Sequence, residues 1–235
     1  MTKNDQKIKR LTALAMFAAL AYVVHFVHIP VGFLNLDFKD VIVSICGMYF
    51  GVLSGLLIAI FVPVLEFITV SDTGPYGLIM NILSSVSFVC VASTIYRFKK
   101  TLLGAIVALV SAVFSMVAVM IVANLVITPY YMGVSVSDVG ALIPTLLLPF
   151  NAIKAVLNAS LTLCLYKPLT SVLKRTGFGK QKTEQGNAEV QKNMRIRTAL
   201  VCAVGGCIAV ASLFVIFFVL GGTIAINLII KTKND

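Results

Sequence analysis

The chain has 235 residues, of which 59% are hydrophobic and 12% charged, whereas soluble domains are about 45–50% apolar and about 25% charged. This composition excludes one or two ordinary soluble domains and indicates a polytopic helical membrane protein. The net charge of +10 does not point to nucleic acid, because most of the 19 basic residues lie in segments that flank apolar runs, as the positive-inside rule predicts for cytoplasmic segments.

Residues 1–172 are predicted to form a six-helix membrane domain with a cytoplasmic N-terminus. The stretch IPVGFLNLDFKD, 29–40, interrupts the apolar pattern with Pro30 and Gly32 and is expected to be an external loop. A second external loop is expected at 128–140, and glycines at four-residue spacing mark a tight inner turn around Gly51. The helices are expected at about 9–29, 40–52, 54–71, 75–96, 101–128 and 144–167.

The rest of the chain is predicted to be a basic cytoplasmic linker, 173–197, and an additional C-terminal transmembrane helix within 198–235. The apolar segment 198–230 is longer than the roughly 20 residues that one span requires, so a tilted or extended helix is expected. This helix would place the C-terminus outside the cell.

The stretch LLPFNAIKAVLNA, 147–159, carries three polar residues inside an apolar helix. Asn151, Lys154 and Asn158 follow the spacing i, i+3 and i+7 and therefore share one face. A lysine at mid-membrane depth costs about 2.5–3.5 kcal/mol and usually faces a cavity, a partner or a substrate. We interpret this face as the wall of a polar ligand pocket. Alternatively, the asparagines form inter-helical hydrogen bonds, worth about 0.6 kcal/mol each.

Three further polar residues lie at a similar depth below the external surface. They are Glu66 in the third predicted helix, Asn81 in the fourth and Asn124 in the fifth. We expect them to belong to the same pocket as Lys154. A Glu66–Lys154 ion pair is an alternative explanation for both charges, and it is compatible with a pocket because a paired lysine can also contact a ligand.

The sequence lacks the motifs that would indicate catalysis. It contains no phosphate-binding loop, no G-x-S-x-G nucleophile elbow and no H-E-x-x-H metal motif. The five cysteines lie in apolar runs without C-x-x-C spacing, and His25 and His28 alone make a weak metal site. The sequence therefore predicts neither an enzyme nor a metal or cofactor site. A small intramembrane enzyme and a purely structural membrane subunit remain as alternatives.

The first predicted helix is rich in alanine. Ala15 and Ala19 have the small-xxx-small spacing that allows another helix to approach closely. From the residues alone, packing against helices of the same chain is the favoured explanation.

Three stretches together resemble a known family. FLNLDFKDV, TGPYGLIMN and LLPFNAIKAVLNA are similar to segments of the S components of energy-coupling-factor vitamin transporters, and within them to the riboflavin-specific S component. The most informative motifs are LDFKD, Leu36 to Asp40, and PFNAIK, Pro149 to Lys154. The resemblance spans residues 8–172 and leaves the seventh predicted helix without a counterpart.

The resemblance implies a subunit of the bacterial cell membrane that captures riboflavin from outside. Riboflavin would then be a transported ligand rather than a cofactor. The subunit would dock on a shared module, made of a transmembrane scaffold protein and two ATPases, to release the vitamin inside. In this family the docking face is an A-x-x-x-A pattern on the first helix, which Ala15 and Ala19 match here. The resemblance therefore favours docking on a partner over packing within the same chain. An S component for a different vitamin or a flavin precursor is the alternative.

The same resemblance assigns roles around the pocket. Asn124, Asn151 and Lys154 are expected to contact the ligand, and the loop from Leu36 to Asp40 is expected to cover it. Leu78 and Phe150 would contribute to the apolar wall. This suits a flavin, because an asparagine matches the carbonyl and N–H groups of the uracil-like edge, and a lysine donates to a carbonyl or ring nitrogen.

Overall fold

The computed structural model describes residues 3–31, 34–70 and 73–175. The predicted seventh helix and nearly all of the predicted linker lie outside these ranges. The elements are, in chain order, α1 (Lys3–His25), β1 (His28–Val31), β2 (Leu34–Asp37), α2 (Lys39–Phe50), α3 (Val52–Thr69), α4 (Gly74–Phe98), α5 (Leu102–Met132), α6 (Val136–Leu142), the π-helical turn η1 (Ile143–Leu147) and α7 (Leu148–Arg175).

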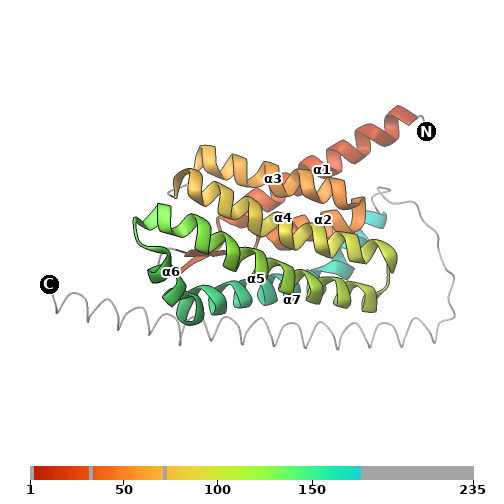
Figure 1. Ribbon diagram of the computed structural model, residues 1–235. Coiled ribbons are helices and arrows are strands. Elements are labelled where there is room, and N and C mark those ends of the chain that lie inside the picture. Colours follow the sequence, from red (N-terminus) through yellow and green to blue (C-terminus); the bar gives the residue numbers. More distant parts are fainter. Residues whose placement is uncertain (1–2, 32–33, 71–72, 176–235) are drawn as a thin grey trace.

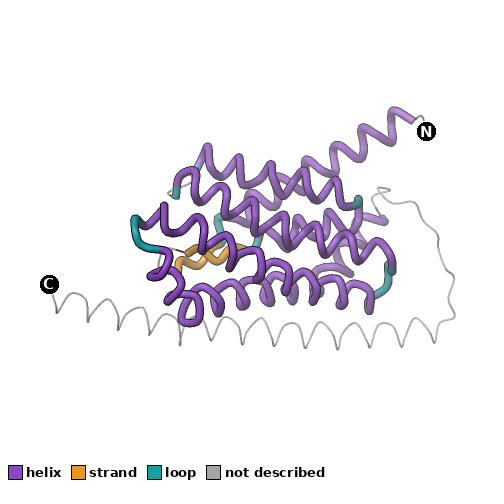
Figure 2. The backbone as a smooth tube through the Cα atoms, in the orientation of Figure 1, coloured by secondary structure: helices purple, strands orange, loops and turns teal. Residues whose placement is uncertain are grey.

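Within the described ranges, five helical runs are long and apolar enough to cross a membrane. They are α1, α3, α4, α5 and the run Val136–Tyr166, which includes α6, η1 and most of α7. Together with the shorter α2 they form the predicted six-helix core. The β-hairpin and the α5–α6 turn lie at one end of the bundle, and the α2–α3 and α4–α5 turns lie at the other (Figure 2). The N-terminal half of α1 projects beyond the bundle at the second end (Figure 1).

Helix α2 occupies the centre of the bundle. Every residue from Lys39 to Met48 is buried, and α2 packs against α1, α3, α4 and α7. Burial on all sides explains why this segment lacks a polar face, since an all-apolar helix is stable only when neighbours surround it. Its N-terminal end carries two buried charged residues, Lys39 and Asp40, which point to a polar layer near the hairpin.

The turn between α2 and α3 is as tight as the glycine spacing predicts. Gly51 separates the helices with a φ of 104°, a conformation that favours glycine. A Cβ on Gly55 would lie 2.8 Å from the Cα of Gly47, so small residues let the two helices cross closely. Arg10 of α1 stabilises this turn, because it donates hydrogen bonds to the Phe50 carbonyl at 3.1 Å and to the Ser54 hydroxyl at 2.7 Å.

The segment 28–37 is partly regular, where the sequence predicts an external loop. β1 and β2 pair antiparallel, with His28 opposite Asp37 and Val31 opposite Leu34. The alternation of Leu34 and Leu36 is the signal that was missed. An isolated two-stranded hairpin is marginal in water, and this one is stabilised because Val31 and Leu36 pack on Phe150 of α7.

The predicted second external loop, 128–140, is wrong. α5 continues to Met132 and α6 begins at Val136. Pro129 is tolerated near the end of α5, where it removes a single backbone donor. Gly133 ends α5 with a φ of 66°, and Ser135 and Asp138 form a capping box that starts α6. The pattern S-x-x-D was a local signal for this second helix.

Candidate ligand-binding site

A hollow at the hairpin end of the bundle encloses about 780 Å³ of atom-free space, including the solvent at its mouth. We call it the main cavity. Its walls come from β2, the start of α4, the end of α5 and the start of α7. His25, at the end of α1, also lines the cavity. Four different helices therefore face one space, which is what a ligand-binding site requires.

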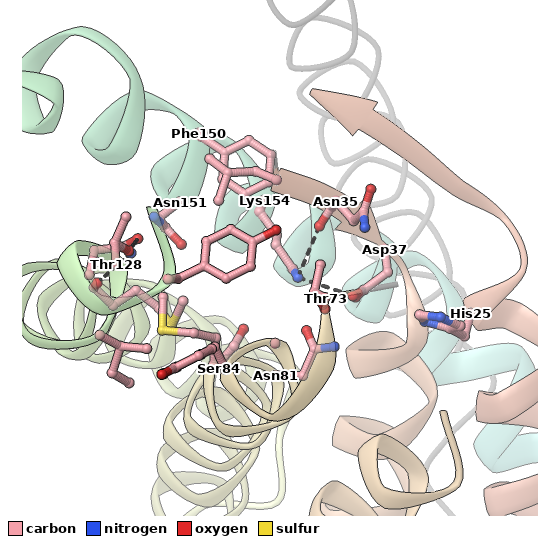
Figure 3. A pocket seen from close by; sticks show the side chains of 18 residues that line it. His25, Asn35, Asp37, Thr73, Asn81, Ser84, Thr128, Phe150, Asn151 and Lys154 are labelled. Carbon is pink, nitrogen blue, oxygen red and sulfur yellow. Dashed lines mark hydrogen bonds and ion pairs between the residues drawn. The ribbon is translucent and has the colours of Figure 1, made fainter. Parts of the chain in front are cut away.

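Lys154 stands at the centre of the main cavity (Figure 3). Its Nζ lies 3.1 Å from Oδ2 of Asp37 and 3.5 Å from the carbonyl oxygen of Asn35. Lys154 is 5% exposed and Asp37 is 1% exposed. Burial would raise the pKa of Asp37, but the ammonium groups of Lys154 and Lys39 outweigh it and hold this pKa below its ordinary value. The hairpin carboxylate is therefore charged and neutralises the membrane lysine.

The two predicted asparagines of the cavity are held by their own helices. Asn124 donates to the Met120 carbonyl at 2.7 Å and accepts from the Thr128 hydroxyl at 2.9 Å. Asn151 donates to the Leu147 carbonyl at 2.7 Å. An asparagine amide has two N–H groups and one carbonyl, so each residue keeps a further N–H while its orientation is set. Figure 3 shows Asn151 and Thr128 on one side of Lys154, and Asp37 and His25 on the other.

The Glu66–Lys154 ion pair that the sequence suggested is not formed. Glu66 instead pairs with Lys39 of α2 through Oε2, while its Oε1 lies 3.2 Å from Nδ1 of His25. Lys39 also lies 3.8 Å from Oδ2 of Asp37. This Lys39–Asp37 contact links the Lys39–Glu66 pair to the Lys154–Asp37 pair. The result is one buried network that joins the hairpin to α2, α3 and α7.

Glu66 lines a second hollow of about 480 Å³, which we call the side cavity. The two cavities share His25, Asn35, Thr73 and Asn81 in their walls. The predicted residue Asn81 therefore faces both spaces. Leu78, expected in the apolar wall of the pocket, lines the side cavity.

Three predicted site residues lie outside both cavity walls. Leu36 is fully buried against α7 under the hairpin. Asp40 accepts a hydrogen bond from the Ser85 hydroxyl at 2.5 Å. Asn158 donates to the backbone carbonyl of Asp37 at 3.3 Å, so it supports the residue that pairs with Lys154. The face predicted on α7 thus has two residues at the cavity and one behind it.

Several wall residues were not recognised from the sequence. Asp37 belongs to the same loop motif as Leu36 and Asp40, but the sequence does not show which acid of that motif reaches Lys154. Tyr76 of α4 and Tyr131 of α5 face each other at the cavity with ring centroids 6.2 Å apart. Tyr131 lay in the segment predicted to be a loop. The remaining apolar wall consists mainly of Met80, Met120, Ile127 and Phe150.

Ala15 and Ala19 are both exposed on α1. Leu11 and Met16, which are 70% and 61% exposed, extend the same helix surface. By contrast, Ala18 and Ala21 are buried against the bundle. The alanine spacing therefore belongs to a side of α1 that the described part of the chain leaves uncovered.

A six-helix membrane core with a polar-lined cavity at one end defines a membrane-embedded binding protein for small molecules. Comparison with protein families makes this specific: the model for the ECF transporter, substrate-specific component, matches residues 9–166. The chain belongs to this family, whose members are transport components and not enzymes.

Two curated relatives and one solved structure agree with this assignment. The chain is 31% identical to Riboflavin transporter RibU of Staphylococcus aureus (strain TCH60) over 182 residues, 73% of this chain and 96% of the relative. It is 25% identical to Riboflavin transporter FmnP of Bacillus subtilis (strain 168) over 163 residues, 64% of this chain and 86% of the relative. The structure described as "Structure and mechanism of the S component of a bacterial ECF transporter" matches with a TM-score of 0.62 and 30% identity, covering 72% of this chain and 99% of the other.

Proposed function

We propose that this protein captures riboflavin at the external side of a bacterial cell membrane and releases it inside after docking on an ATP-driven module. The observation that carries the proposal is the joint position of Asn124, Asn151 and Lys154 in the wall of one cavity. The names of the two relatives, both called riboflavin transporters, support the same ligand.

The chemistry of the main cavity suits a flavin ring. The ring is a wide apolar plane, and the cavity offers Met80, Met120 and Phe150 as flat or adaptable apolar surfaces. The polar edge of the ring carries carbonyls and one N–H. Asn124 and Asn151 supply donors and an acceptor in fixed orientations, and Lys154 donates to an electron-rich oxygen or nitrogen.

The orientation in the membrane follows from charge. The basic segment before the first span and the basic residues Arg97, Lys99 and Lys100 between α4 and α5 belong on the cytoplasmic side under the positive-inside rule. The main cavity is at the opposite end of the bundle, and it would therefore open to the outside. The predicted additional helix would return the chain to the external side.

For the ATP-driven step, we propose that the uncovered side of α1 around Ala15 and Ala19 contacts the scaffold protein. Small exposed residues let a partner helix approach closely. The scaffold and two ATPases would supply the energy, in agreement with the missing phosphate-binding loop of this chain.

The proposal is tested by purifying the full-length protein in detergent from cells grown with ample riboflavin. We expect a yellow preparation whose absorbance spectrum and extracted mass identify riboflavin at near-stoichiometric amount. A colourless preparation that also fails to quench the fluorescence of added riboflavin would refute the flavin assignment. Extraction of another bound vitamin would instead establish the alternative ligand for the same fold.

A further inference from the structure

Among the candidate spans of the described chain, α1 is the least covered by its neighbours. In its most apolar stretch 22% of the residues are buried, against 33–39% in the other four spans. Leu11, Met16 and Val23 are 61–70% exposed, and helical spacing places Ala15 and Ala19 on the same side as these three. We call these five residues the α1 face. It is apolar, has small residues at its centre, and is left uncovered by the described chain.

The described part of the chain ends close to α1. Leu169, near the end of α7, packs against the apolar cluster that includes Phe17 and Ala18 of α1. Helix α7 is described as far as Arg175, six residues later, which is about 9 Å along a helix. This end of α7 and the N-terminal half of α1 lie at the same end of the bundle (Figure 1). The remaining chain therefore continues from a point near α1.

The sequence beyond Arg175 contains one further long apolar segment, 198–230, which is the predicted seventh helix. The linker 176–197 can extend over roughly 70 Å, so it places little restriction on where this segment lies. Both α1 and the segment follow basic stretches, and the positive-inside rule therefore predicts that both run outward from the cytoplasmic side. Two helices that pack side by side in this way would be parallel.

The seventh segment repeats the small-residue spacing of the α1 face. Ala203 and Cys207 are four positions apart, and a free cysteine behaves as a small apolar residue. They come six and ten positions after the last arginine of the linker, whereas Ala15 and Ala19 come five and nine positions after Arg10. Arg10 marks the end of the bundle, because it donates to the α2–α3 turn. The two pairs of small residues are therefore expected at the same depth.

We propose that the seventh segment, 198–230, packs along the α1 face and leaves it when the ATP-driven module docks. Helices in lipid associate through close packing, and paired small residues allow their backbones to approach. A tethered segment has an effective concentration of roughly millimolar near its own chain, which favours it over a second copy of the protein. The competition with the module rests on the proposed function, because that function assigns the same face to the scaffold protein. The packing itself does not.

Disulfide cross-linking of the full-length chain in membranes without the module tests the packing. Cys202→Ala leaves Cys207 as the one cysteine of the segment, and a cleavage site for a specific protease is placed in the linker. After oxidation and cleavage, a non-reducing gel shows whether the segment stays attached. A disulfide needs Cα atoms about 4.4–6.8 Å apart, so Ala15→Cys or Ala19→Cys should retain at least about fivefold more segment than a control that faces elsewhere.

Val110→Cys is the matched control. Val110 is 50% exposed on α5 and comes ten positions after the basic residue Lys100, so it presents a cysteine to lipid at a similar depth on another span. Equal retention by the α5 and α1 variants, or none by either α1 variant, would overturn the packing. Linked full-length copies, seen at twice the mass before cleavage, would assign the face to a second copy and overturn it as well. None of these results depends on riboflavin or the module, so they are separate from a failure of the proposed function.

A second experiment tests the competition with two double variants of the full-length chain. Ala203→Leu with Cys207→Leu puts bulk on the side proposed to contact α1 and should make the module bind at least about threefold more tightly, since the competing contact is weakened. Cys202→Leu with Ala209→Leu is the control, because helical spacing places these two positions on the opposite side. Equal module affinity in both variants and the wild type would exclude competition. No module binding by any of the three would refute the proposed docking, and the cross-links would still decide the packing.

Discussion

Lys154 forms an ion pair in the structure and is proposed to bind the flavin as well, and a double-mutant cycle separates these two roles. Its Nζ lies 3.1 Å from Oδ2 of Asp37, and in the proposed complex it donates to the flavin. Replacing it with methionine keeps the length and apolar stem of the side chain and removes the charge. The single variant Lys154→Met should therefore lose both stability and affinity.

The size of each loss follows from the contacts. Breaking a buried ion pair by removing one partner costs about 3–5 kcal/mol. Lys39 stays 3.8 Å from the same Asp37 oxygen and compensates in part, so we expect the free energy of unfolding to fall by about 3 kcal/mol. A hydrogen bond from a charged donor to the ligand contributes about 1.5–3 kcal/mol, which corresponds to a roughly 10- to 150-fold increase in the Kd for riboflavin.

The second variant, Asp37→Asn with Lys154→Met, removes both charges of the pair. Thermal unfolding in detergent should show that it recovers most of the stability lost in Lys154→Met, because no unpaired carboxylate is left. Riboflavin titration should show that the affinity stays low. Asp37→Asn alone is the control for changes to the hairpin. If the double variant binds riboflavin like wild type, Lys154 is purely structural and the ligand contact is refuted.

Three further predictions concern the fold and the docking surface. Gly55→Ala should lower the melting temperature and cost about 1–3 kcal/mol of stability, because its Cβ would meet the backbone of α2 at 2.8 Å, whereas Gly140→Ala has nothing within 4 Å and should change stability little. Ser135→Ala removes the N-cap of α6 and should cost about 1 kcal/mol in thermal unfolding. Leucine at both Ala15 and Ala19 should abolish co-purification with the scaffold–ATPase module, while riboflavin affinity stays as in wild type.

Each of these has a result that contradicts it. Equal melting temperatures for the two glycine variants would mean that α2 and α3 are not closely packed. A Ser135→Ala protein as stable as wild type would show that the cap adds nothing to α6. Normal module binding by the leucine variant would exclude the proposed α1 contact, and loss of riboflavin binding in the same variant would show that α1 acts on the cavity instead.

Much of the candidate site is visible in one helix. Asn151, Lys154 and Asn158 share a face because helical periodicity is local. In the structure, Asn151 and Lys154 line the main cavity, and Asn158 donates to the backbone carbonyl of Asp37. The partner of Lys154 is not local, since Asp37 is 117 residues away in the chain. The sequence offers three acids as partners of Lys154, namely Asp37, Asp40 and Glu66. The packing of the hairpin on α7 places Asp37 beside Lys154.

The membrane class, the six helices and the polar face of the sixth could be predicted from the residues alone, because apolar length and helical spacing are properties of short segments. The tight glycine turn between α2 and α3 could be predicted in the same way. The hairpin, the extension of α5 past Pro129 and the two linked ion pairs were decided only in the tertiary structure. A short hairpin is stable only when a neighbouring helix covers its apolar side, and a buried charge is stable only beside the partner that packing supplies.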